Sequence, residues 1–400
     1  MSSSKQRILR LSLFALIYFV EGAMLTYFSA FNTLYLRSFD LPYSLIGIVG
    51  GVTLIPFVLK IFIGYLSDRV PLFKVGYRKP YILIGLILQT AAFLVLPFVI
   101  PTEKFGLYLT LVILAALGMS TYDTTTDGLS IDTTPEKDRG LVQGLMVGGR
   151  ALSSVVTAAL MGLFSEKGNW SFIFYMIAVI GIIAFVLTIF VQDVKERAAE
   201  NKFSRAAFSS FKDKAFLLFL ALGIIYPLAL YSTEGMISAF LNEGLGISLG
   251  TVGLYTSVFG IGTILGGVIG GPLMKKIGER SSVLTALVVT SVITFLLAIT
   301  PSAGLMWAVV FLVGFAFGYY ETVYFAMGMD FSDPRIAAFM FSIIMAVGNI
   351  GIGLGAPLAG ALVDSVGFRP MFAIFGAVHL LALPVVFAIF TLRKPNKAQA

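Results

Sequence analysis

The chain has 400 residues and a formal net charge of +7, with 58% hydrophobic and only 12% charged residues. A soluble globular chain carries about 25% charged residues, so this one has too few polar side chains to cover a water-facing surface, and a lipid bilayer is its expected solvent. With no cysteine and one histidine, disulfides, thiolate metal sites and cysteine nucleophiles are excluded, and histidine metal sites or triads are not expected.

Twelve apolar runs, each long enough to cross a bilayer as a helix, follow one another along the chain. In chain order they cover residues 8–36, 43–67, 80–100, 105–134, 138–163, 170–192, 214–241, 248–274, 281–300, 304–330, 335–362 and 368–392. The first run follows basic residues, as a signal peptide does, but it lasts about 28 residues and contains Glu21, so we expect a retained span.

The longest polar break lies between the sixth and seventh runs, and it divides the chain into two sets of six. The sequence therefore predicts an all-α membrane protein with two pseudo-symmetric six-helix bundles. Residues 1–192 form the N-terminal bundle, 193–213 a cytoplasmic linker and 214–400 the C-terminal bundle. Because the linker mixes charged residues with phenylalanines, we expect it to contain a helix at the membrane surface.

The basic residues are distributed asymmetrically between alternate breaks. If the N-terminus is cytoplasmic, the inside segments hold 22 of the 28 Lys and Arg residues, the outside loops hold four and the spans hold two. By the positive-inside rule, both termini are predicted to be cytoplasmic. The high positive charge is then explained by anionic lipid at the cytoplasmic surface, and no nucleic-acid partner is expected.

Two internal repeats relate the halves of the chain. The closer repeat consists of two matching triplets offset by 198 residues: Tyr122-Asp123 with Asp132, and Tyr320-Glu321 with Asp330. The looser repeat matches Glu21-Gly22 and Ser29-Ala30-Phe31-Asn32 in the first span to Glu234-Gly235 and Ser238-Ala239-Phe240-Leu241-Asn242 in the seventh. Both repeats favour two halves of common design.

A third pattern closes one span in every three. It occurs as Gly64-x-Leu66-x-Asp68, Gly162-Leu163-x-x-Glu166, Gly271-x-Leu273-x-Lys275 and Gly360-x-Leu362-x-Asp364. These segments end the second, fifth, eighth and eleventh spans. Such spacing is typical of three-helix units nested within six-helix halves.

The break after the second span carries a family likeness. Gly64-Tyr65-Leu66-Ser67-Asp68-Arg69, followed by Gly76-Tyr77-Arg78-Lys79, resembles the loop signature of the major facilitator superfamily, although residues 70–75 lengthen this copy. The resemblance covers the whole chain and implies alternating access, with Gly64, Asp68, Arg69 and Arg78 as gating residues. The second copy has Lys275 where the family has aspartate, so its lock is expected to be weaker.

A narrower likeness covers about 40 residues of the fourth and fifth spans. Asp123-Thr124-Thr125-Thr126-Asp127-Gly128, with Asp132 and the glycines after Asp138-Arg139, is similar to the muropeptide permease and acetyl-coenzyme A transporter branch. That branch usually has glutamine where this chain has Tyr122. A highly anionic substrate such as acetyl-coenzyme A would also need several interior arginines.

Ionised side chains at bilayer depth cost about 2.5–3.5 kcal/mol on insertion scales, so they are expected to face the protein interior and to have partners or functions. The interior charges are Glu21, Asp123, Asp127, Glu234 and Glu321 against Arg150 and Lys60. By helix rise, Asp123 and Arg150 lie about 16 and 18 Å from the inner ends of consecutive spans. The sequence therefore predicts an Asp123–Arg150 pair strengthened by Asp127, either as a structural ion pair or as a charge lock exchanged during transport.

The remaining acids are candidates for ion coupling or substrate binding. The resemblance places Glu21 and Glu234 on cavity-lining spans, where burial favours the protonated form of a carboxyl group and suits proton uptake and release. Each could instead be a protonated, hydrogen-bonded packing residue. Glu321 is the counterpart of Asp123, but the eleventh span offers Asn349 where the fifth has Arg150, so Glu321 is expected to be neutral or to bind a cation.

Nine span tyrosines are candidates for lining a cavity, with about half expected to be packing or interfacial residues. They are Tyr18, Tyr27, Tyr35, Tyr122, Tyr231, Tyr255, Tyr319, Tyr320 and Tyr324.

The sequence as a whole predicts a monomeric secondary transporter of the cell membrane that moves a small solute by alternating access. The expected coupling ion is a proton, with sodium as the second choice, and no cofactor or metal is expected. A membrane-embedded enzyme is disfavoured because no nucleophile with a base, and no metal cluster, is present. The open alternative is a transporter-like scaffold, receptor or assembly factor without transport.

Overall fold

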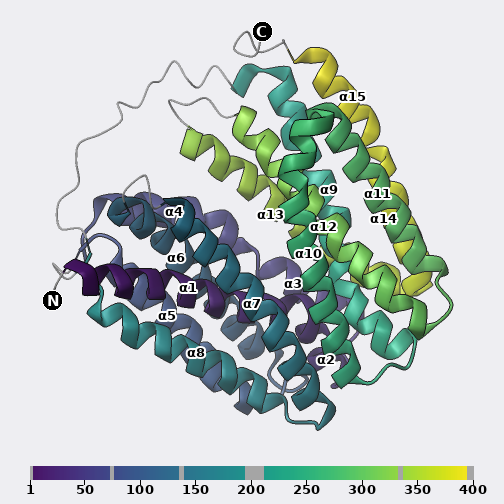
Figure 1. The fold of residues 1–400 in the computed structure, drawn as a ribbon. Coiled ribbons are helices and arrows are strands. Elements are labelled where there is room, and N and C mark those ends of the chain that lie inside the picture. Colours follow the sequence, from purple (N-terminus) through teal and green to yellow (C-terminus); the bar gives the residue numbers. More distant parts are fainter. Residues whose placement is uncertain (1–2, 73–75, 135–138, 194–210, 332–336, 394–400) are drawn as a thin grey trace. The chain divides into compact units, whose positions relative to one another are not determined.

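The computed structural model describes the chain except for residues 1–2, 73–75, 135–138, 194–210, 332–336 and 394–400 (Figure 1). The described part is helical and contains no strand. Its α-helices are α1 (Ser3–Thr26), α2 (Asn32–Arg37), α3 (Tyr43–Val52), α4 (Ile55–Arg69), α5 (Lys79–Val95), α6 (Phe105–Thr133), α7 (Arg139–Glu166), α8 (Trp170–Phe190), α9 (Lys214–Ala239), α10 (Leu249–Ile277), α11 (Glu279–Ile299), α12 (Ala303–Phe331), α13 (Ala337–Val366), α14 (Phe368–Leu381) and α15 (Leu383–Leu392).

These helices join into 12 candidate membrane spans, which confirms the predicted fold class. The fourth, sixth and ninth spans cover Phe105–Thr133, Trp170–Phe190 and Glu279–Ile299, within two residues of the predicted limits. The agreement follows from physics, because a helix satisfies its own backbone hydrogen bonds in lipid and its length is set by bilayer thickness. The predicted surface helix of the linker falls on residues 194–210, outside the described part.

Two spans consist of two helices each, and proline lies at both breaks. Pro56 stands in the first turn of α4, and Pro384 stands in the first turn of α15. Proline lacks the N–H that would continue the preceding helix, so a new helix begins there. Spans 1 and 7 each contain a π-helical segment, Tyr27–Phe31 and Phe240–Gly244, and the looser sequence repeat coincides with both.

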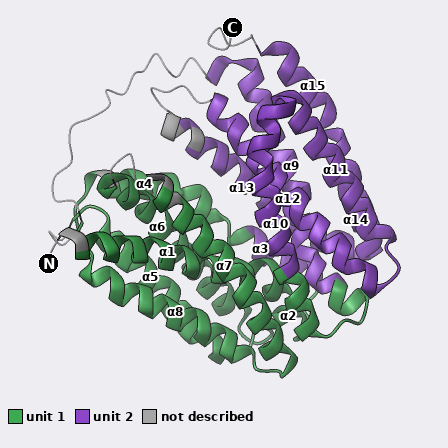
Figure 2. Ribbon diagram, viewed as in Figure 1, with its two compact units in different colours: residues 1–42, 52–199, 241–257 green, residues 43–51, 200–240, 258–400 purple. Residues whose placement is uncertain are grey.

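The chain forms two compact units (Figure 2). Unit 1 comprises residues 1–42, 52–199 and 241–257, and unit 2 comprises residues 43–51, 200–240 and 258–400. Each unit therefore contains a short segment from the other half of the sequence. The division into bundles at residues 192 and 214 remains a prediction.

The same span pairs pack together inside each unit. In unit 1, span 1 packs along span 5 as α1 on α7, and span 3 packs on spans 4 and 6 as α5 on α6 and α8. In unit 2, span 7 packs along span 11 as α9 on α13, and span 9 packs on spans 10 and 12 as α11 on α12 and α14. The sequence repeat thus corresponds to a repeated packing scheme.

Large apolar side chains are exposed on the outside of the helices. Phe62, Phe98 and Ile299 are 69%, 74% and 69% exposed. In water such exposure would favour aggregation, but in a bilayer it gives the contact with acyl chains that a membrane span requires. The polar side chains that carry function are therefore expected in the interior.

Close packing of α5 on α6 depends on glycine. A Cβ atom on Gly118 would lie 2.5 Å from the Gly85 carbonyl oxygen and 2.6 Å from the Gln89 nitrogen, both of which are rigid backbone atoms. We expect Gly118→Ala to lower the free energy of unfolding by about 1–3 kcal/mol through overpacking. The measurement is the melting temperature of the purified protein in detergent.

Gly148→Ala is the matched control, because no atom lies within 4 Å of a Cβ atom at this helical position in α7. Alanine should leave stability unchanged there or raise it by up to about 1 kcal/mol through helix propensity. Equal melting temperatures for the two variants would contradict the close-packing interpretation.

Candidate functional site

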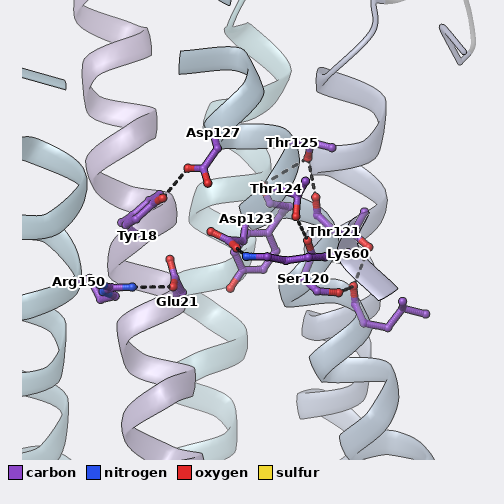
Figure 3. A network of polar contacts seen from close by, with 12 residues as sticks. Tyr18, Glu21, Lys60, Ser120, Thr121, Asp123, Thr124, Thr125, Asp127 and Arg150 are labelled. Carbon is purple, nitrogen blue, oxygen red and sulfur yellow. Dashed lines mark hydrogen bonds and ion pairs between the residues drawn. The ribbon is translucent and has the colours of Figure 1, made fainter. Parts of the chain in front are cut away.

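Five of the charged side chains expected inside the membrane gather within unit 1 (Figure 3). Glu21 comes from α1, Lys60 from α4, Asp123 and Asp127 from α6, and Arg150 from α7. These four helices belong to spans 1, 2, 4 and 5, so no single segment forms the site. The packing of unit 1 brings the residues together.

Glu21 and Arg150 form an ion pair across α1 and α7. Arg150 Nη1 donates to Glu21 Oε1 at 3.3 Å. The Glu21 side chain is 6% exposed, whereas the Arg150 side chain keeps 45% of its surface accessible. The second carboxylate oxygen of Glu21 is buried and has no hydrogen-bond partner in the described part of the chain. The pair therefore combines a buried acid that has one unused oxygen with a guanidinium that remains open to a further ligand.

Asp123 pairs with Lys60, so the predicted partner of Asp123 was wrong. Lys60 Nζ lies 3.4 Å from Asp123 Oδ2, and the two side chains are 22% and 11% exposed. The prediction assumed that consecutive spans pack together. In the structure α7 packs extensively along α1 and only marginally on α6, so Arg150 meets Glu21 instead.

Asp127 binds a phenol and does not strengthen an Asp123–Arg150 pair as expected. The Tyr18 hydroxyl donates to Asp127 Oδ1 at 2.5 Å. Tyr18 lies one turn before Glu21 on α1, so this helix contributes to both contacts (Figure 3). Tyr18 was one of nine candidate tyrosines in the sequence, and only the packing of α1 beside α6 singles it out.

The hydroxyl groups around these acids bond to their own helix. Thr121 Oγ1 donates to the Leu117 carbonyl at 2.6 Å, and Thr124 Oγ1 donates to the Ser120 carbonyl at 2.8 Å. Thr125 Oγ1 likewise donates to the Thr121 carbonyl at 2.7 Å. These hydroxyls do not supply donors to the carboxylates, so charge balance in the cluster depends on the two bases.

Unit 2 has a different polar interior. The Tyr226 hydroxyl donates to Glu321 Oε1 at 2.5 Å, joining α9 to α12. Tyr226 also packs between the rings of Tyr320 and Tyr324, with centroid distances of 4.5 Å to each. Sequence reasoning missed Tyr226, because nothing local distinguishes it from a packing tyrosine.

Glu234 and Asn349, the other two site candidates of unit 2, are half-buried in α9 and α13. Each takes part in an interaction, and neither belongs to the cluster of unit 1. Their assignment to coupling or substrate binding remains a prediction.

The gating residues implied by the loop signature lie at the ends of α4 and α5. Arg78 is buried and donates to Asp132 Oδ2 at 3.0 Å and to Ser67 Oγ at 2.7 Å. Arg69 stacks on Tyr65 with its guanidinium carbon 4.1 Å from the ring centroid. Gly64 allows α4 to approach Thr124 of α6. The side chain of Asp68 lies outside the described part, so its role as a lock remains a prediction.

Among the described residues, no group of three or more His, Cys, Asp or Glu side chains is placed to hold a metal ion. The cluster of unit 1 can exchange protons and ion-pair partners, and neither process requires a nucleophile.

Comparison with known proteins gives a family match over almost the entire chain. The family model described as Major Facilitator Superfamily matches residues 14–240 and 219–400. The chain is 24% identical to the anhydromuropeptide permease of Escherichia coli over 348 residues, covering 82% of this chain and 70% of the permease. It is 21% identical to the gentisate transporter of Corynebacterium glutamicum over 389 residues, covering 94% and 85% of the two chains.

Solved structures with the same fold are also transporters. A bacterial homolog of the human lysosomal transporter Spinster, in an inward-facing and unoccupied conformation, superposes with a TM-score of 0.80 at 15% identity, covering 99% of this chain and 100% of that one. The nucleoside transporter NupG superposes with a TM-score of 0.79 at 14% identity, covering 98% and 100% of the two chains. At these identities the likeness establishes the fold alone.

Proposed function

Because the chain belongs to the Major Facilitator Superfamily, we propose that it is a proton-coupled secondary transporter that moves a small solute by alternating access. It is a multi-pass membrane transporter and not an enzyme. The matched relatives named above are bacterial, and the expected location is the bacterial inner membrane. Coupling to protons is the part of the proposal that rests on the cluster in unit 1.

The observation that carries the proposal is the charge of that cluster. Three carboxylates, Glu21, Asp123 and Asp127, face two bases, Lys60 and Arg150, so the fully ionised cluster has one negative charge in excess. The three acids interact electrostatically with one another. An uncompensated charge at membrane depth is costly. Uptake of a single proton would neutralise the cluster, which suits a coupling site.

Glu21 is the proposed site of that proton. Its unpartnered Oε2 can hold a proton without breaking an existing hydrogen bond. Protonation would remove the negative charge that holds Arg150, and the guanidinium would then be free to bind a carboxylate or another acceptor of the solute. In this mechanism proton and solute are coupled because both act on the same ion pair.

Asp123 and Asp127 have other roles in the proposal. The Lys60 ammonium compensates Asp123 at 3.4 Å. The Tyr18 hydroxyl compensates Asp127 at 2.5 Å, although a neutral donor leaves the carboxylate charge in place. Lys60 and Tyr18 would then keep the overall charge low while Glu21 gains and loses its proton. Asp127 is the second candidate for the proton, because its partner carries no charge.

The experiment is reconstitution into liposomes with an imposed pH gradient. Acidification of the vesicle interior on solute addition, or solute accumulation driven by the gradient, is the expected result. A matched sodium gradient without a pH gradient tests the second coupling ion. A protein that binds solute but moves none under either gradient would favour the scaffold or receptor alternative.

A ligand must first be found, because the names of the relatives do not select a substrate. They include a muropeptide permease, a gentisate transporter and a folate-biopterin transporter. A ligand of the resting state raises the melting temperature by mass action, by about 2.7 kcal/mol of stability at 100 times its dissociation constant. A thermal-shift panel of sugars, peptides, lipids, drugs and aromatic acids therefore identifies the solute for the transport assay.

A further inference from the structure

Two helix N-termini are held by carboxylates from other helices. In unit 1, Glu166 at the end of α7 accepts a hydrogen bond from the Gly250 N–H in the first turn of α10, at 2.7 Å. In unit 2, Asp364 near the end of α13 accepts from the N–H groups of Tyr43 and Ser44 at the start of α3, at 3.0 and 2.7 Å. The first N–H groups of a helix have no partner within the helix, and its dipole favours an anion at this end.

A glycine precedes each carboxylate by about one turn. A Cβ atom on Gly162 would lie 2.8 Å from the Gly253 Cα atom, so α7 and α10 approach with backbones nearly in contact. A Cβ atom on Gly360 would collide with the Tyr43 carbonyl group. In both places the glycine permits close approach and the carboxylate caps the helix that approaches.

These contacts assign a role to two copies of the repeated span-end pattern. Gly162 with Glu166, and Gly360 with Asp364, are the copies that close the fifth and eleventh spans. The helix starts that they hold belong to segments 241–257 and 43–51, and each of these segments lies in the compact unit formed mainly by the other half of the sequence.

A third contact holds one of these segments. The Arg37 guanidinium forms a two-point ion pair with Glu243, with nitrogen–oxygen distances of 2.8 and 3.1 Å. Both residues lie in unit 1, and Glu243 is part of the segment 241–257. The start of α10 is therefore held by charged contacts on two sides.

We propose that Glu166 and Asp364 are two matched clasps, which hold the outer ends of the transporter closed and must release their helices before it can open to the outside. The inference rests on the proposed function, because it assumes alternating access and cytoplasmic termini, which place these span ends on the outer side. A charge-assisted hydrogen bond to a helix N-terminus suits this role, since it is strong when aligned and is lost when the helices separate.

The test uses the natural absence of cysteine from the chain. A single cysteine at Ala158 reports on the α7–α10 contact, because this residue is fully buried and its carbonyl oxygen lies against Gly253. A single cysteine at Ala359 reports on the α13–α3 contact, because this residue is also fully buried and precedes Gly360. The measurement is the rate of modification by a membrane-impermeant maleimide added to the outside of intact cells or right-side-out vesicles.

Removing a clasp should expose its reporter. We expect Glu166→Ala to speed modification at the Ala158 position, and Asp364→Ala to speed it at the Ala359 position, by about tenfold each. The double variant should exceed either single variant at both reporters. Glu103→Ala is the matched control, because Glu103 is an exposed carboxylate in the loop before α6 and should leave both rates unchanged.

Unchanged modification in both alanine variants would overturn the proposal, and so would an equal increase in the Glu103 control. If an alanine variant fails to fold, as judged by size-exclusion chromatography, Glu166→Gln and Asp364→Asn keep the shape and remove the charge. A smaller increase is expected for them, and no increase would refute the clasps. The labelling needs no solute, so a protein that moves nothing but shows faster labelling would refute the proposed transport and retain the clasps.

Discussion

Glu21→Gln is expected to abolish solute accumulation driven by a pH gradient while leaving solute binding intact. Glutamine keeps the size of the side chain and an acceptor for Arg150, but it cannot exchange a proton. Without the proton, the energy of the gradient no longer reaches the solute. One pH unit corresponds to about 1.4 kcal/mol and therefore to about tenfold accumulation when one proton moves with each solute molecule.

The wild-type protein under a gradient of two pH units should therefore approach about 100-fold accumulation, whereas Glu21→Gln should remain near an inside-to-outside ratio of about one. Exchange of labelled for unlabelled solute, which needs no net proton movement, should persist. Glu103→Gln is the matched control, because it removes an exposed carboxylate remote in sequence from the cluster.

Undiminished accumulation in Glu21→Gln would remove Glu21 from coupling. Asp123→Asn and Asp127→Asn then decide whether the cluster is involved at all. Loss of coupling in one of them would move the proton to that residue. Retained coupling in all three would refute the cluster as the coupling site.

Arg150→Lys is expected to lower the transport rate by at least about tenfold, which corresponds to about 1.4 kcal/mol of lost transition-state stabilisation. Lysine keeps the charge but loses the planar fork, which lets arginine contact Glu21 and a second acceptor at once. The Arg150 side chain is 45% accessible and only one of its nitrogens bonds Glu21, so the rest of the fork is available to the solute. Normal transport by Arg150→Lys would favour a purely structural ion pair.

Stability measurements separate these two roles of Arg150. Arg150→Ala should lower the free energy of unfolding by about 1–3 kcal/mol, because it leaves the Glu21 charge uncompensated at membrane depth. The double variant Glu21→Gln with Arg150→Gln should recover much of that loss and still fail to transport. Arg10→Lys, near the cytoplasmic start of α1, is the control for the Arg-to-Lys change and should retain both stability and transport.

The clasps and the cluster address different steps of the proposed cycle. Loss of a clasp should change the accessibility of buried positions without removing the coupling proton. Glu21→Gln should remove coupling without exposing the Ala158 reporter. A variant that changed both readouts would show that charge compensation in unit 1 also stabilises its contact with segment 241–257.

Three features of the protein follow from local sequence alone. Hydropathy determines the twelve spans, because bilayer thickness imposes a fixed length of apolar helix. The repeats predict the common packing scheme of the two units, because similar segments bury similar faces. The cost of charge in lipid singles out Glu21, Asp123 and Arg150 as interior residues that need partners, and each of them has one.

The partners themselves were decided only by tertiary structure. Helices that are adjacent in sequence need not pack together, so equal depth on spans 4 and 5 did not pair Asp123 with Arg150. The packing of α1 against α7 gave Arg150 to Glu21, and it brought Lys60 and Tyr18 to the two aspartates. Likewise, the span-end pattern identified Glu166 and Asp364 as equivalent, but only the fold shows which helix each one caps. Hydropathy and periodicity are properties of a single segment, whereas an ion pair depends on which faces of different segments meet.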